Sequence, residues 1–200
     1  MNITADIVKQ LREQTGAGFM DCKRALSETE GNLDKAKDLL RQKGFATASK
    51  KTGREASEGL IGSYIHMDKI GVLVEINCET DFVAKTDEFR GVVKDIAMHV
   101  AAASPAYLKR ENIPSDVIDK EKEIYASQIK GKPPHVIEKI LQGKLEKFYT
   151  DNCLVDQLFV KDPQQKKKIK DLVMEKIAKF GENIVIKRFV RFQLGEKAGS

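Results

Sequence analysis

Few residues in this chain of 200 amino acids have the types and spacing that carry chemistry. The three histidines, His66, His99 and His135, share no metal-ligand spacing with one another or with a cysteine. We therefore interpret each of them as a surface or boundary residue. The sequence predicts no bound metal ion and no other cofactor.

The glycines that could bind phosphate also lack the required context. Thr15-Gly16-Ala17-Gly18 follows a predicted helix and lacks the third glycine of a dinucleotide-binding turn. Gly131-Lys132 is followed by Pro133 instead of serine or threonine, and no Walker glycine precedes it at the required spacing. With no catalytic constellation and no nucleotide-binding motif, we expect that the protein is not an enzyme.

Composition limits where the protein works. Cys22, Cys78 and Cys153 are odd in number and far apart, and no Cys-x-x-Cys pair occurs. This pattern argues against a disulfide framework or a structural zinc site and fits buried thiols in a reducing cytosol. Hydrophobic content of 41% with 32% charged residues is typical of globular proteins, and no apolar run could span a membrane. We expect a cytoplasmic protein without a membrane contact.

One polar corner remains after this search. The apolar run Ile70–Ile76 turns abruptly polar at Asn77, and the apolar pair Phe82-Val83 then interrupts the polar residues. The simpler interpretation makes Phe82 a core side chain under a strand-to-helix connection and Asp81 a turn residue. The alternative is a corner built to push on another molecule, and the residues alone leave both open.

The first part of the chain has the periodicity of helices. Residues 1–45 predict a domain of three short helices, with Thr4 and Asn32 as N-caps and Gly16 and Gly44 as helix ends. Residues 46–58 are small and charged without an apolar period, which predicts a linker.

Residues 59–200 predict an α+β core domain. The runs 60–66 and 70–77 are strand-like and are separated by a short hairpin connection, and amphipathic helices follow. We expect a small antiparallel sheet of about three strands with helices on one face. The alternation of the last strand assigns five apolar residues to one face: Ile184, Ile186, Val190, Phe192 and Leu194.

Several segments, in chain order, resemble the bacterial elongation factor Ts family in its short, single-core form. The run 11–26 looks like the first signature of that family, and the stretch 31–44 continues it. Residues 77–85, Asn-Cys-Glu-Thr-Asp-Phe-Val-Ala-Lys, are similar to the central signature, and 188–192 resemble the final strand. Phe19 stands where the family often has methionine.

This resemblance implies a guanine nucleotide exchange factor for elongation factor Tu, the GTPase that carries aminoacyl-tRNA. The factor would bind the GDP-bound and nucleotide-free partner, disturb its Mg²⁺ and phosphate site, and promote exchange of GDP for GTP. In the family, a ubiquitin-associated-like three-helix domain docks on the partner, and a Thr-Asp-Phe-Val motif displaces its Mg²⁺. The matching motif residues here are Thr80, Asp81, Phe82 and Val83. The docking residues that the resemblance implies are Leu11, Arg12, Thr15, Gly16, Met20, Asp21, Cys22 and His66.

The resemblance also bears on architecture and partners. Long members carry a duplicated core half and a coiled-coil hairpin, whereas this chain has one strand pair. Short members can complete their interface as a homodimer, and the half-exposed last strand is a candidate contact. A rival interpretation is a nucleic-acid-binding protein that uses lysine clusters such as 166–168. A net charge of +5 with interspersed signs is weak support for it, and we expect no direct nucleic acid binding.

Overall fold

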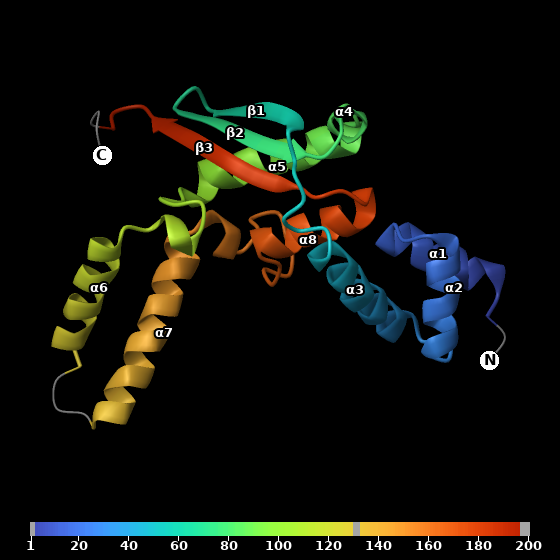
Figure 1. The fold of residues 1–200 in the computed structure, drawn as a ribbon, viewed down its shortest axis with the longest axis horizontal. Helices are drawn as coiled ribbons and strands as arrows, with labels where there is room; N and C mark the ends of the chain where they lie inside the picture. The colour runs from blue at the N-terminus through green and yellow to red at the C-terminus, as the bar shows by residue number, and fades with distance from the viewer. Residues whose placement is uncertain (1–2, 130–132, 197–200) are drawn as a thin grey trace.

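The computed structural model describes residues 3–129 and 133–196, and it confirms the predicted α+β class (Figure 1). A three-stranded sheet is covered on one face by helices, with the N-terminal helices on one side of this core and a helical hairpin on the other. The helices are α1 (Ala5–Thr15), α2 (Phe19–Glu28), α3 (Leu33–Ser49), α4 (Asp81–Ala84), α5 (Asp87–Ala103), α6 (Ser115–Ser127), α7 (Pro134–Asn152) and α8 (Ile169–Phe180), with short 3₁₀ turns at Arg110–Asn112 and Leu154–Asp156. The strands are β1 (Glu58–His66), β2 (Ile70–Cys78) and β3 (Val185–Gln193).

The sheet is antiparallel, in the order β1-β2-β3. The predicted hairpin is confirmed, because β1 and β2 pair throughout and Met67 and Asp68 turn the chain with φ of 49° and 55°. Alternate β2 side chains point into the core against α5, where Phe89 is fully buried. A Cβ on Gly62 of β1 would lie 2.3 Å from Val93 Cγ1, so this close approach of α5 to the sheet requires glycine.

The alternation predicted for the last strand is wrong. The pairing of β3 with β2 shifts by one residue between Ile186 and Arg188, so Lys187 forms a bulge. Because a one-residue shift reverses which side chains face the core, Ile186 is buried while Val190 and Phe192 lie on the opposite, open face. The five apolar residues of this strand therefore do not share one face.

The N-terminal helices share a small core of their own, and its buried residues are Val8, Leu11, Cys22, Ala25, Leu26 and Ala36. The predicted end of the third helix at Gly44 is wrong, because α3 continues to Ser49. Gly44 lies inside the helix, where a Cβ would be 3.4 Å from Ala178 Cβ of α8, and Ala48 is buried in the sheet's core. The start of the proposed linker is thus a packed helix, while the division into domains at 1–45, 46–58 and 59–200 stays a prediction.

The α6–α7 hairpin projects from the core, so a helical hairpin accompanies a single sheet in this chain (Figure 1). Its base is held by Arg110, which donates to Asp156 Oδ2 at 2.7 Å and to both oxygens of Glu146 at 2.7 and 2.9 Å. The buried Asp156 also accepts from Lys170 at 2.9 Å. These ion pairs join the hairpin to α8.

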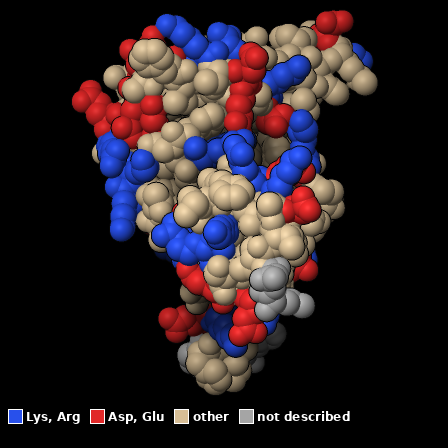
Figure 2. Space-filling view, turned by 90° about the vertical axis from the view of Figure 1, so that its right-hand side faces the viewer, with Lys and Arg blue, Asp and Glu red and all other residues tan. Residues whose placement is uncertain are grey.

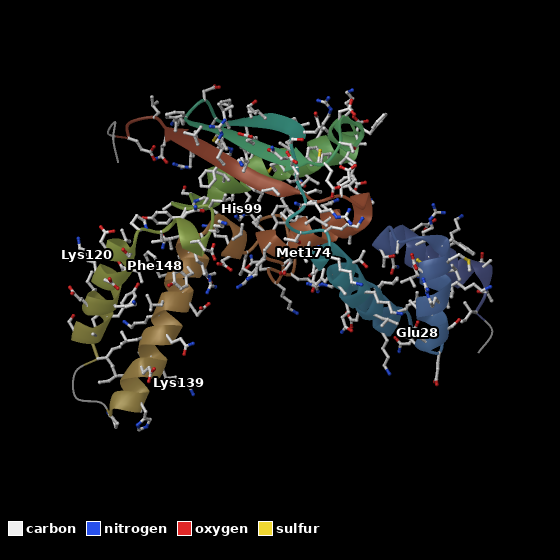
Figure 3. The ribbon with its side chains drawn as sticks, viewed as in Figure 1. Glu28, His99, Lys120, Lys139, Phe148 and Met174 are labelled. Carbon is white, nitrogen blue, oxygen red and sulfur yellow. The ribbon has the colours of Figure 1, made fainter. Side chains whose placement is uncertain are left out.

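His99 corrects the surface interpretation of the histidines. It lies beneath the sheet on α5 and is fully buried, whereas His66 and His135 are exposed as predicted (Figure 3). Its Nε2 lies 3.0 Å from Gln157 Oε1, and its Nδ1 accepts the Val160 N–H at 3.3 Å. Burial lowers the pKa of His99, which favours the neutral ring.

None of the described helices is long and apolar enough to cross a membrane.

Candidate partner-binding site

The polar corner after β2 is a single turn of helix, α4, with Thr80 as its N-cap. The Thr80 hydroxyl accepts the Val83 N–H at 3.4 Å and donates to Glu182 Oε1 at 2.6 Å. Glu182 Oε2 also accepts the backbone N–H groups of Glu79 at 3.1 Å and Thr80 at 3.0 Å. A four-residue helix is not stable alone, so these contacts fix the turn.

Phe82 projects from this turn into solvent. Its side chain is 81% exposed, the highest value of any large apolar residue in the described part of the chain. Val83 is half-buried against the main core, and Ala84 is buried. The motif is therefore divided between an outward ring and an inward anchor, and the interpretation of Phe82 as a core residue is wrong.

Asp81 lies beside this ring and forms an ion pair with Lys85 one helical turn further on, at 2.5 Å. The hydrogen bond from Lys85 lowers the pKa of Asp81, and the same contact raises the pKa of Lys85. Both side chains thus stay charged at neutral pH. The exposed end of the α4 turn, formed by Asp81 and Phe82, is the tip of this site. It offers a partner one apolar ring and one carboxylate. Within residues 3–129 and 133–196, no cluster of three metal-ligating side chains occurs.

The thiol beneath the turn is inert. Cys78 is buried and donates to the Thr80 carbonyl oxygen at 3.2 Å. Burial, followed by the negative charge of Glu182, raises the pKa of Cys78 to about 11. The thiol is therefore protonated at neutral pH, and it supports the turn as a small packed group. All three cysteines are buried and free, as the sequence predicted.

The candidate docking residues on the N-terminal helices separate by exposure. Leu11 and Cys22 are fully buried, so they hold the helices together and cannot touch a partner in this conformation. Thr15 is half-buried, and its hydroxyl donates to the Leu11 carbonyl oxygen at 2.7 Å. The members with side chains or backbone at the surface are Arg12, Gly16, Met20 and Asp21. Met20, at the start of α2, is 68% exposed.

His66 is not brought close to the tip. It ends β1 opposite Ile70, whereas Glu58 at the other end of β1 pairs with Cys78 beside the turn. Eight residue steps of strand correspond to about 26 Å. His66 is exposed, with its Nδ1 3.1 Å from the Tyr64 hydroxyl. A partner that met both regions would have to extend along the sheet.

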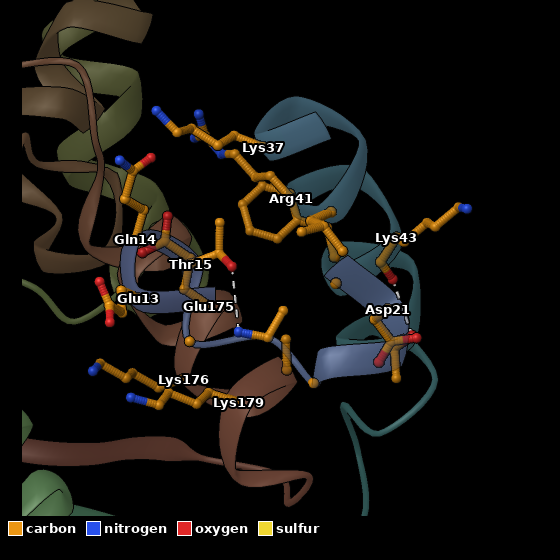
Figure 4. Close-up of a pocket in the computed structure, with 18 of the residues that line it drawn as sticks. Glu13, Gln14, Thr15, Asp21, Lys37, Arg41, Lys43, Glu175, Lys176 and Lys179 are labelled. Atoms are coloured by element: carbon orange, nitrogen blue, oxygen red, sulfur yellow. Dashed lines mark hydrogen bonds between the residues drawn. The ribbon is translucent and has the colours of Figure 1, made fainter. Parts of the chain in front are cut away.

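A cleft of about 700 Å³ separates the loop after α1 from α8 (Figure 4). The Thr15 hydroxyl accepts the Ala17 N–H at 3.3 Å, which closes the loop on itself. Several cations line the cleft, but Lys176 and Lys179 pair with Glu88 at 2.8 and 2.7 Å. Lys167, Lys43, Lys37 and Arg24 have acidic partners too.

Seen from the side of the N-terminal helices, basic side chains gather in the middle of the surface, with acidic ones around and between them (Figure 2). A phosphate group in the cleft would compete with carboxylates already in place. The structure therefore does not support the weak phosphate-loop pattern at residues 15–18 as an anion site.

Comparison with known proteins identifies the family. The sequence model described as elongation factor TS matches residues 46–196, about three quarters of the chain. The chain belongs to the elongation factor Ts family. Elongation factor Ts of Thermodesulfovibrio yellowstonii is 66% identical over 197 residues, covering 98% of each chain. That of Fervidobacterium nodosum is 59% identical, covering 98% of this chain and all of the relative. The Geobacter sulfurreducens protein is 56% identical, over 98% and 91%.

The chain is therefore a translation elongation factor of this family. Sequence reasoning missed one residue of this site, Glu182. It lies 102 positions after Thr80, and no motif connects the two. Only the packing of the end of α8 against the corner after β2 reveals the contact.

Proposed function

We propose that this chain is a guanine nucleotide exchange factor that binds elongation factor Tu·GDP, disturbs its Mg²⁺ and phosphate site, and promotes exchange of GDP for GTP. The observation that carries the proposal is the 81% exposed Phe82 on a turn held by polar contacts, in a chain of the elongation factor Ts family. The exchange factor supplies no bond-breaking residue of its own.

The mechanism is differential binding. GDP in a GTPase is held by a backbone cradle around the phosphates and by Mg²⁺ bridging phosphate and protein oxygens. A factor that binds the nucleotide-free partner more tightly than the GDP form must, by linkage, weaken GDP binding by the same factor. The ring of Phe82 inserts between elements that otherwise close around the Mg²⁺ site. Burying one ring contributes about 1.5–3 kcal/mol, a tenfold to roughly hundredfold bias.

Asp81 adds a polar component. Its ionised carboxylate competes for backbone amides at helix ends near the partner's phosphates, or for the groups that hold the hydrated metal. Neither residue accounts for rapid exchange alone. The exposed docking residues Arg12, Met20 and Asp21 contribute affinity from the N-terminal helices. The continuous α3 then sets the distance between the two contact regions.

The open face of the sheet is the proposed homodimer contact. Its exposed apolar side chains are Ile61, Ile65, Leu73, Val190 and Phe192. They come from all three strands and are adjacent in register, since Leu73 lies opposite Val190. A second copy of the same face would bury them, and its twofold arrangement would be self-complementary.

We place the proposed nucleotide exchange in the cytoplasm, where translation takes place.

The test is stopped-flow release of fluorescently labelled GDP from elongation factor Tu, with and without this protein. Acceleration that saturates with protein concentration is the expected result. No acceleration at any concentration would overturn the proposal. In parallel, a filter-binding titration with tRNA alone should show no specific binding, while steeply salt-dependent binding would favour the nucleic-acid alternative.

A further inference from the structure

The corner between α8 and β3 contacts both the tip and the segment that follows α3. Glu182 in this corner accepts three hydrogen bonds from Glu79 and Thr80, all within 3.1 Å. In return, Glu79 Oε1 accepts the Asn183 N–H at 2.6 Å. The two carboxylates thus cap each other's backbone across two segments more than 100 residues apart in sequence.

The same corner holds the chain leaving the N-terminal helices. The Asn183 side-chain amide donates to the Arg54 carbonyl oxygen at 2.7 Å, and the Lys51 ammonium donates to the Gly181 carbonyl oxygen. Asn183 is buried, and Gly181 has φ of 74°, a left-handed conformation that favours glycine. Residues 181–183 are therefore fixed on both sides.

We infer that Glu182 is a positioning residue for nucleotide exchange: it holds the α4 turn so that the ring of Phe82 is presented in one orientation. The inference rests on the exchange activity proposed above and adds to it a residue that touches neither nucleotide nor partner. Its contacts reach Thr80, and Thr80 in turn caps the helix that carries Phe82.

The acceptor geometry explains why this position needs a carboxylate. One oxygen serves two backbone N–H groups while the other receives the Thr80 hydroxyl, so both oxygens must be acceptors. Glutamine keeps only one acceptor oxygen, and alanine removes both. Without the acceptor, the Thr80 hydroxyl is free to rotate, the single turn frays, and the ring must be ordered again at each encounter with the partner.

Saturation kinetics of GDP release from elongation factor Tu test the inference with Glu182→Ala, Glu182→Gln and the control Glu175→Gln. Glu175 lies on α8 and pairs with Lys167 at 2.7 Å, so its replacement by glutamine also neutralises a bound carboxylate, but away from the tip. We expect Glu182→Ala to lower the maximal release rate about fivefold to tenfold, with half-saturation changed less than about twofold. Glu182→Gln should lie between Glu182→Ala and the unchanged protein, and the control should match the latter.

A double-mutant cycle separates positioning from general support. If Glu182 acts through Phe82, then adding Glu182→Ala to Phe82→Ala should lower the rate less than about twofold further. Losses that multiply, or full activity in Glu182→Ala, would overturn the inference. If the alanine variant does not fold, the same cycle with Glu182→Gln decides.

Hydrogen exchange of the isolated protein gives a readout that does not depend on the partner. Glu182→Ala should accelerate exchange of the amides of Thr80 and Val83 roughly tenfold while those of α5 keep their protection. Unchanged protection at the turn would count against positioning even if GDP release slowed. If the unchanged protein fails to accelerate GDP release but the turn loosens as described, the proposed function fails while the structural contact stands.

Discussion

The α4 turn and the open face of the sheet both expose apolar side chains, and they do so in different ways. The tip exposes one ring, Phe82, on a single helical turn held by hydrogen bonds to Glu182. The open sheet face exposes side chains from three adjacent strands, among them Phe192 at 66%. The tip is thus a single ring on a turn held by polar contacts, whereas the sheet face is an extended apolar surface on paired strands.

The difference indicates separate tasks. A single ring buries too little area to hold two proteins together, but it can enter a narrow site and shift an equilibrium there. A flat apolar face lacks such reach, but it supplies area for a second copy of the same chain. We therefore propose that nucleotide release belongs to the tip and self-association to the sheet face, a division that substitutions in each region can test.

The largest expected effect is on the sheet face. Phe192→Glu would place an unpaired charge within the proposed homodimer contact, weakening it by roughly a hundredfold or more. Sedimentation at micromolar concentration should change from the mass of two chains to that of one, 22.4 kDa. If the unchanged protein is already a monomer, the proposal that the sheet face serves self-association is wrong. Lys139→Glu on the α6–α7 hairpin is the control and should leave the mass as it is.

A smaller effect is expected from a change in pH, which alters the stability of the core that supports both regions. The pKa of His99 is lowered by burial on α5, so the unfolded chain binds a proton more readily than the folded one. The free energy of unfolding therefore holds above about pH 6.5 and decreases as the pH falls from there toward the lowered folded value.

His99→Gln should remove the pH dependence of thermal unfolding that begins as the pH falls below about 6.5, at some cost in stability at neutral pH. Groups with lowered carboxyl pKa values, such as Asp156, lose their stabilising charge only at lower pH. An undiminished slope in the variant would show that another group titrates. His66→Gln, at an exposed position, is the control.

The smallest effect is expected for the ion pair at the tip. Lys85→Ala lets the pKa of Asp81 return toward its ordinary range, but the carboxylate stays ionised at neutral pH. Because both side chains are exposed, maximal GDP release should change by less than about twofold. A large loss of maximal GDP release in Lys85→Ala that persists at high salt would mean that Lys85 itself contacts the partner.

The sequence was sufficient for the regular elements of the fold. The apolar run of β2, the helical periodicity of α5 and the turn at Met67-Asp68 are local signals, and each matches the structure. The exposed tip followed from its family resemblance, because residue types alone could not distinguish an exposed Phe82 from a buried one.

The predictions that failed depended on tertiary contacts. α3 passes through Gly44 because α8 packs closely against it there, which overrides the local tendency of glycine to end a helix. The bulge at Lys187 reverses the faces of β3 without any change in its apolar pattern. His99 is accommodated in the core only because Gln157 and the Val160 N–H lie within hydrogen-bonding distance.

The most direct test replaces one aromatic ring in each region by alanine and compares the two variants. At saturating concentration of each variant, Phe82→Ala should slow GDP release from elongation factor Tu by roughly tenfold or more, with its sedimentation and thermal unfolding unchanged. Phe192→Ala should weaken self-association and leave the maximal release rate within about twofold. Normal GDP release by Phe82→Ala, or its unfolding, would contradict the assignment of nucleotide release to the exposed ring.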